Sequence, residues 1–121
     1  MSTWTTDELR RLDQLTEIRV AGRRADQTVR TLTIVWHVVV NDRLYVRSVR
    51  GTEGSWYKGV TRHHEGAIAF DGQTRDVTYI SDATADDQID KAYFAKYGNG
   101  SPTRAITNAA AKQTTLRIEP R

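Results

Sequence analysis

Residues 31–49 read TLTIVWHVVVNDRLYVRSV, and this stretch decides the fold. Its first part, Thr31–Val40, is rich in β-branched and aromatic residues, and its last part, Arg43–Val49, alternates between polar and apolar residues. Between them, Asn41-Asp42 is a two-residue loop of the type that tolerates positive φ. The pattern therefore predicts a β-hairpin in which Val40 faces Arg43.

Counting outward from this turn assigns the hairpin residues to two faces, because cross-strand partners lie on the same side of a sheet. One face carries Val39 with Leu44, His37 with Val46 and Val35 with Ser48; the other carries Val38 with Tyr45, Trp36 with Arg47 and Ile34 with Val49. Both faces are largely apolar, which indicates a barrel interior on one side and a helix or partner subunit on the other. Trp36 opposite Arg47 would allow a cation–π contact of about 0.5–1 kcal/mol.

The chain before the hairpin predicts a helix and one strand. Thr5 and Glu8 match a capping box, so a short helix begins there, and residues 16–20 alternate as a first strand. After the hairpin, Gly66–Phe70 and Gln73–Ile80 flank an Asp71-Gly72 turn and predict a second hairpin. Its apolar face carries Ile68, Phe70, Val77 and Tyr79.

The last third of the chain predicts two helices and a closing strand. A helix capped by Asp82 or Thr84 has a stripe of Ile89, Tyr93 and Tyr97, a weaker helix covers residues 103–112, and residues 114–118 alternate as a strand. Six strands with two or three peripheral helices predict a mainly β, α+β fold, a small antiparallel β-barrel.

Composition limits the possible chemistry. The chain has 121 residues and no cysteine, so we expect one domain over residues 1–121 without disulfides or thiolate catalysis. The first residues are too polar for a signal peptide and no apolar run reaches membrane-spanning length, which predicts a cytoplasmic protein with no membrane association.

Positive charge gathers in the hairpin region. Residues 22–62 hold eight basic and three acidic side chains, whereas the whole chain has a net charge of +3. The basic residues there are Arg23, Arg24, Arg30, Arg43, Arg47, Arg50, Lys58 and Arg62. This surface would attract an anionic partner, although a solvated basic face is an equally good interpretation. Gly51, Gly54 and Gly59 bracket Ser55-Trp56-Tyr57-Lys58, and Ser55 is a candidate N-cap for a single helical turn.

The histidines favour structural roles. His37 lies mid-strand on an apolar face, which is typical of a packed, hydrogen-bonded core histidine, although it would be a candidate proton donor if that face opened to a pocket. Adjacent His63 and His64 point opposite ways in an extended segment, so no metal site is expected. No side chain stands out as a general acid or base, and the catalytic residues stay unassigned.

Motifs along the whole chain resemble an uncharacterised bacterial family, domain of unknown function 2255. They are Trp4 with Glu8-Leu9, LYVRSVRG at 44–51, SWYKG at 55–59, IDKAY at 89–93 with KYG at 96–98, and TLRIEPR at 115–121. The resemblance brings no activity with it.

A more distant resemblance is to the deazaflavin-dependent nitroreductase-like proteins. A basic turn after Gly22, a hairpin, Arg50-Gly51 and Ser55-Trp56-Tyr57 follow in the same order, although this chain has Ala25-Asp26 where that family has glycine and serine. The resemblance implies a split β-barrel of the pyridoxamine phosphate oxidase-like, flavin-binding superfamily, a homodimer, and FMN or a deazaflavin as cofactor. The cofactor-binding residues would come from Arg23, Arg24, Arg30, Arg47, Arg50, Gly51, Ser55, Trp56 and Lys58, with the arginines near phosphate.

Three function classes therefore stay open. The first is a flavin- or deazaflavin-binding oxidoreductase. The second is a dimeric barrel that binds another small anionic ligand or acts as a non-catalytic interaction module. The third, a nucleic-acid binder, ranks last because the aromatic residues alternate with aliphatic ones in a pattern typical of buried positions.

Overall fold

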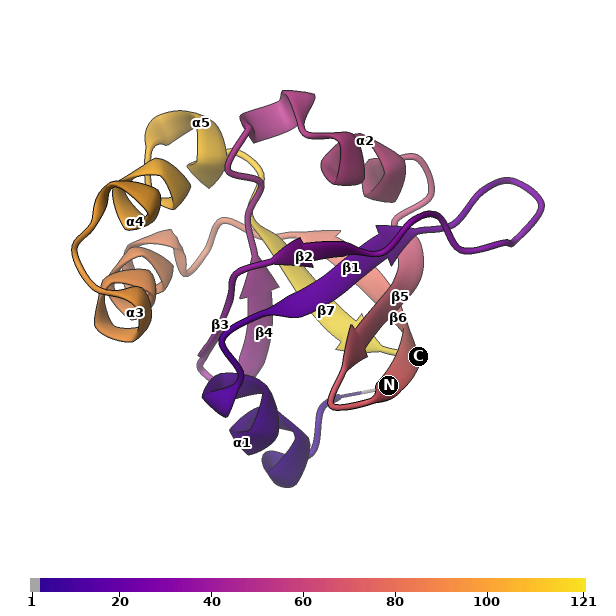
Figure 1. Ribbon diagram of the computed structural model, residues 1–121, viewed down its shortest axis with the longest axis horizontal. Helices are drawn as coiled ribbons and strands as arrows, with labels where there is room; N and C mark the ends of the chain where they lie inside the picture. The colour runs from indigo at the N-terminus through magenta and orange to yellow at the C-terminus, as the bar shows by residue number, and fades with distance from the viewer. Residues whose placement is uncertain (1–2) are drawn as a thin grey trace.

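Seven antiparallel strands form one curved sheet in the order β2-β1-β5-β6-β7-β4-β3. The computed structural model describes residues 3–121. The strands are β1 (Ile18–Gly22), β2 (Thr33–Val35), β3 (His37–Val40), β4 (Arg43–Val46), β5 (Glu65–Phe70), β6 (Gln73–Ser81) and β7 (Leu116–Pro120). The two edge strands, β2 and β3, are separated in sequence only by Trp36, so the edges of the sheet meet and the sheet closes into a barrel that is split at this seam (Figure 1).

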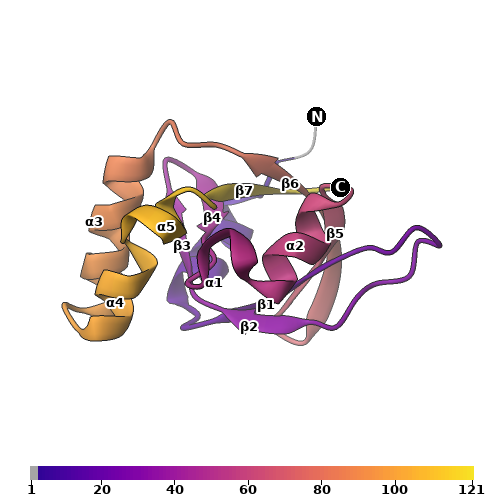
Figure 2. The ribbon, with the colours of Figure 1, turned by 90° about the horizontal axis from the view of Figure 1, so that it is seen from above.

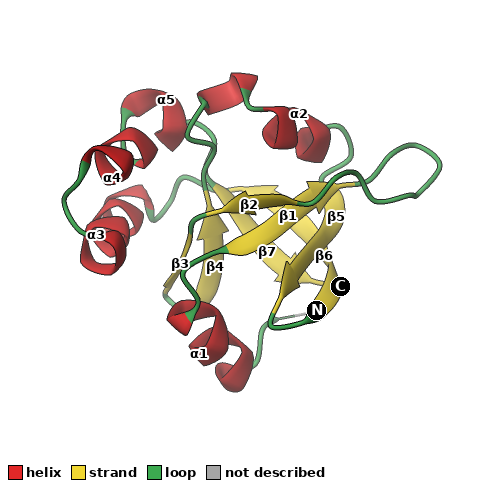
Figure 3. Cartoon of the chain, in the orientation of Figure 1, coloured by secondary structure: helices red, strands yellow, loops and turns green. Residues whose placement is uncertain are grey.

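Helices cover the outside of this barrel. They are α1 (Thr6–Gln14), the 3₁₀ turn η1 (Gly51–Glu53), α2 (Ser55–Thr61), α3 (Asp86–Tyr97), α4 (Ser101–Ile106) and α5 (Ala109–Lys112). Helices α3, α4 and α5 gather on the side of β3 and β4, α2 packs across β1, and α1 lies at the opposite end from α2 (Figures 1 and 2). Figure 3 shows the long loop between β1 and β2, which projects away from the barrel. Within the described residues, no helix is long and apolar enough to cross a membrane.

The predicted first hairpin is confirmed near its turn. Asn41 and Asp42 have φ of 53° and 62°, as a two-residue hairpin turn requires. The register pairs His37 with Val46, Val38 with Tyr45, Val39 with Leu44 and Val40 with Arg43, as predicted. One side of the hairpin packs into the barrel core, and α3 and α4 cover its other side. This matches the expected barrel interior and covering helix.

The outer part of this hairpin prediction is wrong. The stretch Thr31–Val40 is not one strand: it breaks at Trp36, and β2 pairs with β1, placing Val35 beside Ile18. Ile34 and Val35 therefore do not pair with Val49 and Ser48. This break explains why the barrel has seven strands where six were predicted.

The predicted contact between Trp36 and Arg47 is also replaced. Trp36 stacks on Tyr97, with the ring centroids 4.0 Å apart and the rings 6° from parallel. The guanidinium of Arg47 instead lies over the ring of Tyr93, 5.7 Å from its centroid. Both replacement partners belong to α3, so packing against this helix outweighs continued pairing along the hairpin.

Other local predictions divide between confirmed and corrected ones. The capping box of Thr5 and Glu8 and the second hairpin with its Asp71-Gly72 turn are present, and the apolar face of that hairpin is buried. Ala85, not Asp82 or Thr84, is the N-cap of α3. The predicted helix over residues 103–112 is interrupted and forms α4 and α5. Gly54 is the N-cap of α2, so Ser55 is its first helical residue and α2 is longer than the single turn expected.

Candidate functional site

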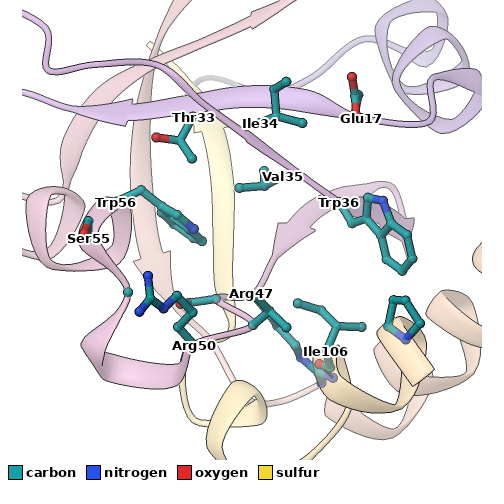
Figure 4. Close-up of a pocket in the computed structure, with 14 residues that line it drawn as sticks. Glu17, Thr33, Ile34, Val35, Trp36, Arg47, Arg50, Ser55, Trp56 and Ile106 are labelled. Atoms are coloured by element: carbon teal, nitrogen blue, oxygen red, sulfur yellow. Dashed lines mark hydrogen bonds between the residues drawn. The ribbon is translucent and has the colours of Figure 1, made fainter.

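A pocket of about 440 Å³ opens at the seam of the barrel (Figure 4). It lies where β2 separates from the segment that follows β4. The predicted hairpin pairs the residues on its two sides, Ile34 with Val49 and Val35 with Ser48. Its lining residues are Glu17, Thr33, Ile34, Val35, Trp36, Arg47, Ser48, Val49, Arg50, Gly54, Ser55, Trp56, Pro102 and Ile106. This volume is within the range of about 300–1,000 Å³ that is typical of small-molecule sites.

The walls of the pocket are mainly apolar. Val35 and Ile106 are buried, and Trp36 and Trp56 are half-buried at opposite ends (Figure 4). Ile34 and Val49 line the rim and are each 52% exposed. Two exposed β-branched side chains beside an apolar pocket indicate a surface suited to a partner or ligand.

Polar groups gather where β4 continues toward α2. The Ser48 hydroxyl is buried and has no hydrogen-bond partner among the described residues, although its backbone N–H donates to the Thr114 hydroxyl at 2.7 Å. A Cβ at Gly54 would lie 2.3 Å from the Ser48 Oγ, so only glycine leaves room for this hydroxyl. Ser55 and Arg50 also line this end, and the Arg50 side chain is exposed with no ion pair among the described residues.

Arg47 lines the same pocket but its guanidinium already has partners. The side chain is buried, with 1% of its surface exposed. It donates to Asp90 at 2.5 Å, to Asp86 at 3.0 Å and to the Thr115 hydroxyl at 3.0 Å. Burial by itself would raise the pKa of Asp90, but hydrogen bonds from Lys112 and Arg47 outweigh it and lower this pKa. Arg47 therefore ties the end of β4 to α3 and to the start of β7.

The other predicted cofactor residues lie outside the pocket lining. Arg23 pairs with Asp76 and donates to the backbone carbonyl of Gln27, and Arg24 donates to the carbonyl of Val29 at 3.0 Å, so both stabilise the projecting loop between β1 and β2. Three further predicted residues remain. Arg30 is half-buried against Gly59, and its Nε has no hydrogen-bond partner in the part of the chain that the structure describes. Gly51 starts η1 beside Ala110, and Lys58 pairs with Glu53 at 2.8 Å. Of the nine predicted residues, the structure brings together Arg47, Arg50, Ser55 and Trp56.

Several lining residues have no signal in the sequence. Glu17 comes from the connection between α1 and β1, and Pro102 and Ile106 come from α4. The predicted hairpin places Ser48 and Trp36 in a continuous ladder, where they would not face an open space. Their position depends on how β2 pairs with β1, which is a long-range contact without a local sequence signal.

His37 is a core residue, as its mid-strand position indicated. It is fully buried, and its Nε2 lies 2.5 Å from the carbonyl oxygen of Leu12. Burial, followed by the nearby charge of Lys96, lowers the pKa of His37 to about 4. The ring is therefore neutral at physiological pH and does not line the pocket.

These features define a class of protein: a seven-stranded split β-barrel with a ligand-sized pocket at its seam. The chain belongs to the family described as uncharacterised protein conserved in bacteria (DUF2255), whose model matches residues 8–118. No curated protein shows significant sequence similarity to it.

Solved structures share the fold at low sequence identity. A conserved hypothetical protein of Mycobacterium tuberculosis, Rv2991, is 9% identical with a TM-score of 0.61, covering 97% of this chain and 79% of that one. An F420 reductase is 14% identical with a TM-score of 0.58, covering 93% and 91%. HutZ, the heme storage protein of Vibrio cholerae, is 10% identical with a TM-score of 0.62, covering 96% and 88%. At these identities the likeness establishes the split-barrel fold.

Proposed function

We propose that the seam pocket binds the ring system of a flavin or deazaflavin, with an anionic group of the cofactor at Arg50, and that the protein is an oxidoreductase. The observation that carries this proposal is the combination of apolar, aromatic walls with Arg50 at one end, an exposed arginine that has no ion pair among the described residues. An F420 reductase with the same fold supports the cofactor class.

The residues present fit such a cofactor. Trp56 and Val35 offer apolar contacts to a planar ring, and the Arg50 guanidinium offers a planar set of donors suited to a phosphate or carboxylate. The Ser48 hydroxyl has no partner within residues 3–121 and is enclosed beside Gly54 at the same end of the pocket. When bound, a flavin or deazaflavin supplies hydride transfer, and these side chains hold and orient it.

Heme fits this pocket less well, although HutZ shares the fold. None of the described residues that line the pocket is histidine, cysteine, methionine or tyrosine, the side chains that usually ligate heme iron. The buried His37 already lies against Leu12. The pocket therefore favours a metal-free planar ligand.

The expected homodimer belongs to this proposal. The strand β2 is at the edge of the sheet, and Ile34 on it is half-exposed beside the pocket. A second copy placed against this edge would cover Ile34 and narrow the pocket, which suits a cofactor held between subunits. A cytoplasmic location is part of the same proposal.

The test is a titration with FMN, FAD, riboflavin and a deazaflavin, followed by absorbance and thermal denaturation. Binding at 100 times the dissociation constant would stabilise the fold by about 2.7 kcal/mol. Arg50→Ala removes a charge-assisted hydrogen bond, so we expect about ten- to hundredfold weaker binding. Arg43→Ala is the matched control, since Arg43 is exposed on the hairpin and outside the pocket lining. Equal losses in both variants, or no saturable binding of any of the four compounds, would contradict the proposal. Saturation by a different small anion that depends on Arg50 would favour the non-catalytic alternative.

A further inference from the structure

Strand pairing breaks at Trp36, and this break forms one end of the pocket. β2 ends at Val35, β3 starts at His37, and Trp36 between them lines the pocket at the end away from Arg50 (Figure 4). Counted outward from the hairpin turn, His37 and Val46 form a pair without direct hydrogen bonds, so the N–H and carbonyl of His37 point to the outer edge of the sheet. Because His37 is fully buried, these two groups need partners from elsewhere in the fold.

The last turn of α3 supplies these partners. The N–H of His37 donates to the hydroxyl oxygen of Tyr97 at 3.1 Å, and Lys96 Nζ donates to the carbonyl oxygen of His37, also at 3.1 Å. The Tyr97 hydroxyl lies 2.8 Å from the carbonyl oxygen of Thr16 and 3.0 Å from that of His37, so its one proton can be donated to either. Burial raises the pKa of Tyr97 to about 12, so the hydroxyl keeps this proton at physiological pH. Tyr97 therefore joins the start of β3 to the segment that leads into β1.

The ring of Tyr97 supports the indole of Trp36. The two rings are stacked, with centroids 4.0 Å apart and planes 6° from parallel. Tyr97 also stacks on Tyr93, with centroids 5.9 Å apart and planes at 28°. Tyr93 is fully buried, so Tyr97 connects the half-buried indole to a ring that is fixed in the core. Such aromatic pairs add stability beyond the burial of their surface.

Tyr97 acts on the pocket from behind its wall. It does not belong to the pocket lining, so a ligand in the pocket would touch Trp36 and not Tyr97. A second link from α3 to the break, from the Tyr93 hydroxyl to the carbonyl oxygen of Trp36, is long at 3.5 Å. Tyr97 is thus the residue that fixes both the backbone after Trp36 and the plane of the indole.

We propose that Tyr97 is a positioning residue of the seam pocket: its hydroxyl holds the strand break, and its ring holds the Trp36 indole as a fixed wall for the ligand. The constraint on Trp36 is a property of the protein without ligand, whereas the effect on binding rests on the proposed function. A wall that is already in place costs less ordering when a ligand binds. Tyr97→Phe removes only the hydroxyl, and Tyr97→Leu removes the ring as well, so the two variants separate the two roles.

Hydrogen exchange tests the role of the hydroxyl in the protein without ligand. In Tyr97→Phe the amide of His37 loses its acceptor, so we expect its exchange to become about three- to tenfold faster, relative to amides of β5. Tyr57→Phe is the matched control, since Tyr57 is half-buried and outside the pocket lining, and its hydroxyl makes no hydrogen bond within residues 3–121. An unchanged exchange rate at His37 in Tyr97→Phe, or an equal increase in the control, would overturn the inference. This test stands even if Tyr97→Leu fails to fold.

The indole N–H signals in ¹⁵N NMR spectra test the role of the ring. In Tyr97→Leu the Trp36 indole loses the stacked ring, so its signal should shift, whereas Tyr97→Phe keeps the stack and should shift it little. Trp56 lies at the other end of the pocket, and Trp4 is buried and donates to a distant carbonyl oxygen, so neither signal should move. An unshifted Trp36 signal in Tyr97→Leu, or equal shifts of all three signals, would overturn the inference.

Ligand binding completes the test. Its probe is whichever of FMN, FAD, riboflavin and the deazaflavin binds the natural protein most tightly. Tyr97→Leu should weaken this binding about three- to tenfold, whereas Phe94→Leu, which removes a 36% exposed ring from the same helix, should leave it unchanged. Equal affinity in the natural protein and Tyr97→Leu would overturn the inference and leave the proposed cofactor standing. Binding of none of the four compounds, with the changes at His37 and Trp36 present, would refute the proposed cofactor and support the constraint on Trp36.

Discussion

Arg47 and Arg50 are three residues apart, and we predict that replacing Arg47 greatly lowers the stability of the fold whereas replacing Arg50 hardly changes it. Arg47→Met removes a fully buried cation, leaves Asp86 without an ion-pair partner within residues 3–121 and leaves Asp90 with Lys112 alone. Breaking a buried ion pair from one side typically costs about 3–5 kcal/mol, because an uncompensated charge stays in a region of low dielectric. Arg50→Met removes an exposed side chain and should change the free energy of unfolding by less than about 0.5 kcal/mol.

Urea and thermal denaturation monitored by circular dichroism measure this difference. For a chain of this size, the loss at Arg47 corresponds to a fall in melting temperature of about 10–20 °C. A triple variant, Arg47→Met with Asp86→Asn and Asp90→Asn, should recover part of the stability, since it removes the stranded charges as well. The reasoning is refuted if Arg47→Met costs no more than Arg50→Met, or if the triple variant is less stable than Arg47→Met alone. It would then follow that the guanidinium of Arg47 does not hold α3 against β4.

Two further predictions concern the core. The pKa of His37 is about 4 in the folded protein against 6.5 when unfolded, so its contribution to the free energy of unfolding is complete above pH 6.5 and falls by up to about 3 kcal/mol as the pH drops to 4. Chemical denaturation across this pH range should show this loss in the natural protein and not in His37→Gln. Equal pH dependence of the two proteins would contradict the prediction. A Cβ at Gly66 would lie 1.9 Å from the carbonyl oxygen of Ala21, so Gly66→Ala should cost about 1–3 kcal/mol by forcing β5 from β1. Gly100→Ala, with its nearest contact at 3.5 Å to Pro102, should cost only about 0.5 kcal/mol, from the loss of a preferred N-cap of α4. Similar melting temperatures for the two variants would show that the sheet adapts.

The sequence predicted those features of the fold that depend on interactions between residues close together in the chain. Asn41-Asp42 specifies a tight turn by itself, and the four residue pairs nearest to it follow from that turn without reference to the rest of the chain. Ile89 and Tyr93 likewise reveal their buried stripe through helical spacing. The barrel class was predictable because these local patterns, taken together, allow few other arrangements.

Competition between segments far apart in the sequence decided the features that the sequence did not predict. Nothing in Thr33–Val35 indicates that β1 offers a better partner than residues 48 and 49, and nothing near Arg47 indicates that two aspartates some forty residues later will bury it. In the sequence, Arg47 and Arg50 are equivalent members of one basic stretch. Only the packing of α3 on β4 separates a structural arginine from one that is free to bind a ligand.

The position where the hairpin prediction fails is also the position of the pocket, and the two facts have one cause. Continued pairing of Ile34 and Val35 with Val49 and Ser48 would close the seam, cover two apolar side chains and place Ser48 within a ladder. The chain instead ends the pairing at Trp36 and leaves Ile34 and Val49 each 52% exposed, with the Ser48 hydroxyl unpartnered among the described residues. Local sequence preference and the final fold usually agree except at functional sites, where stability is given up for an open, shaped surface. A ligand or second subunit at the seam would restore the burial of Ile34 and Val49, so the departure from the expected ladder is itself an argument that the seam is the site.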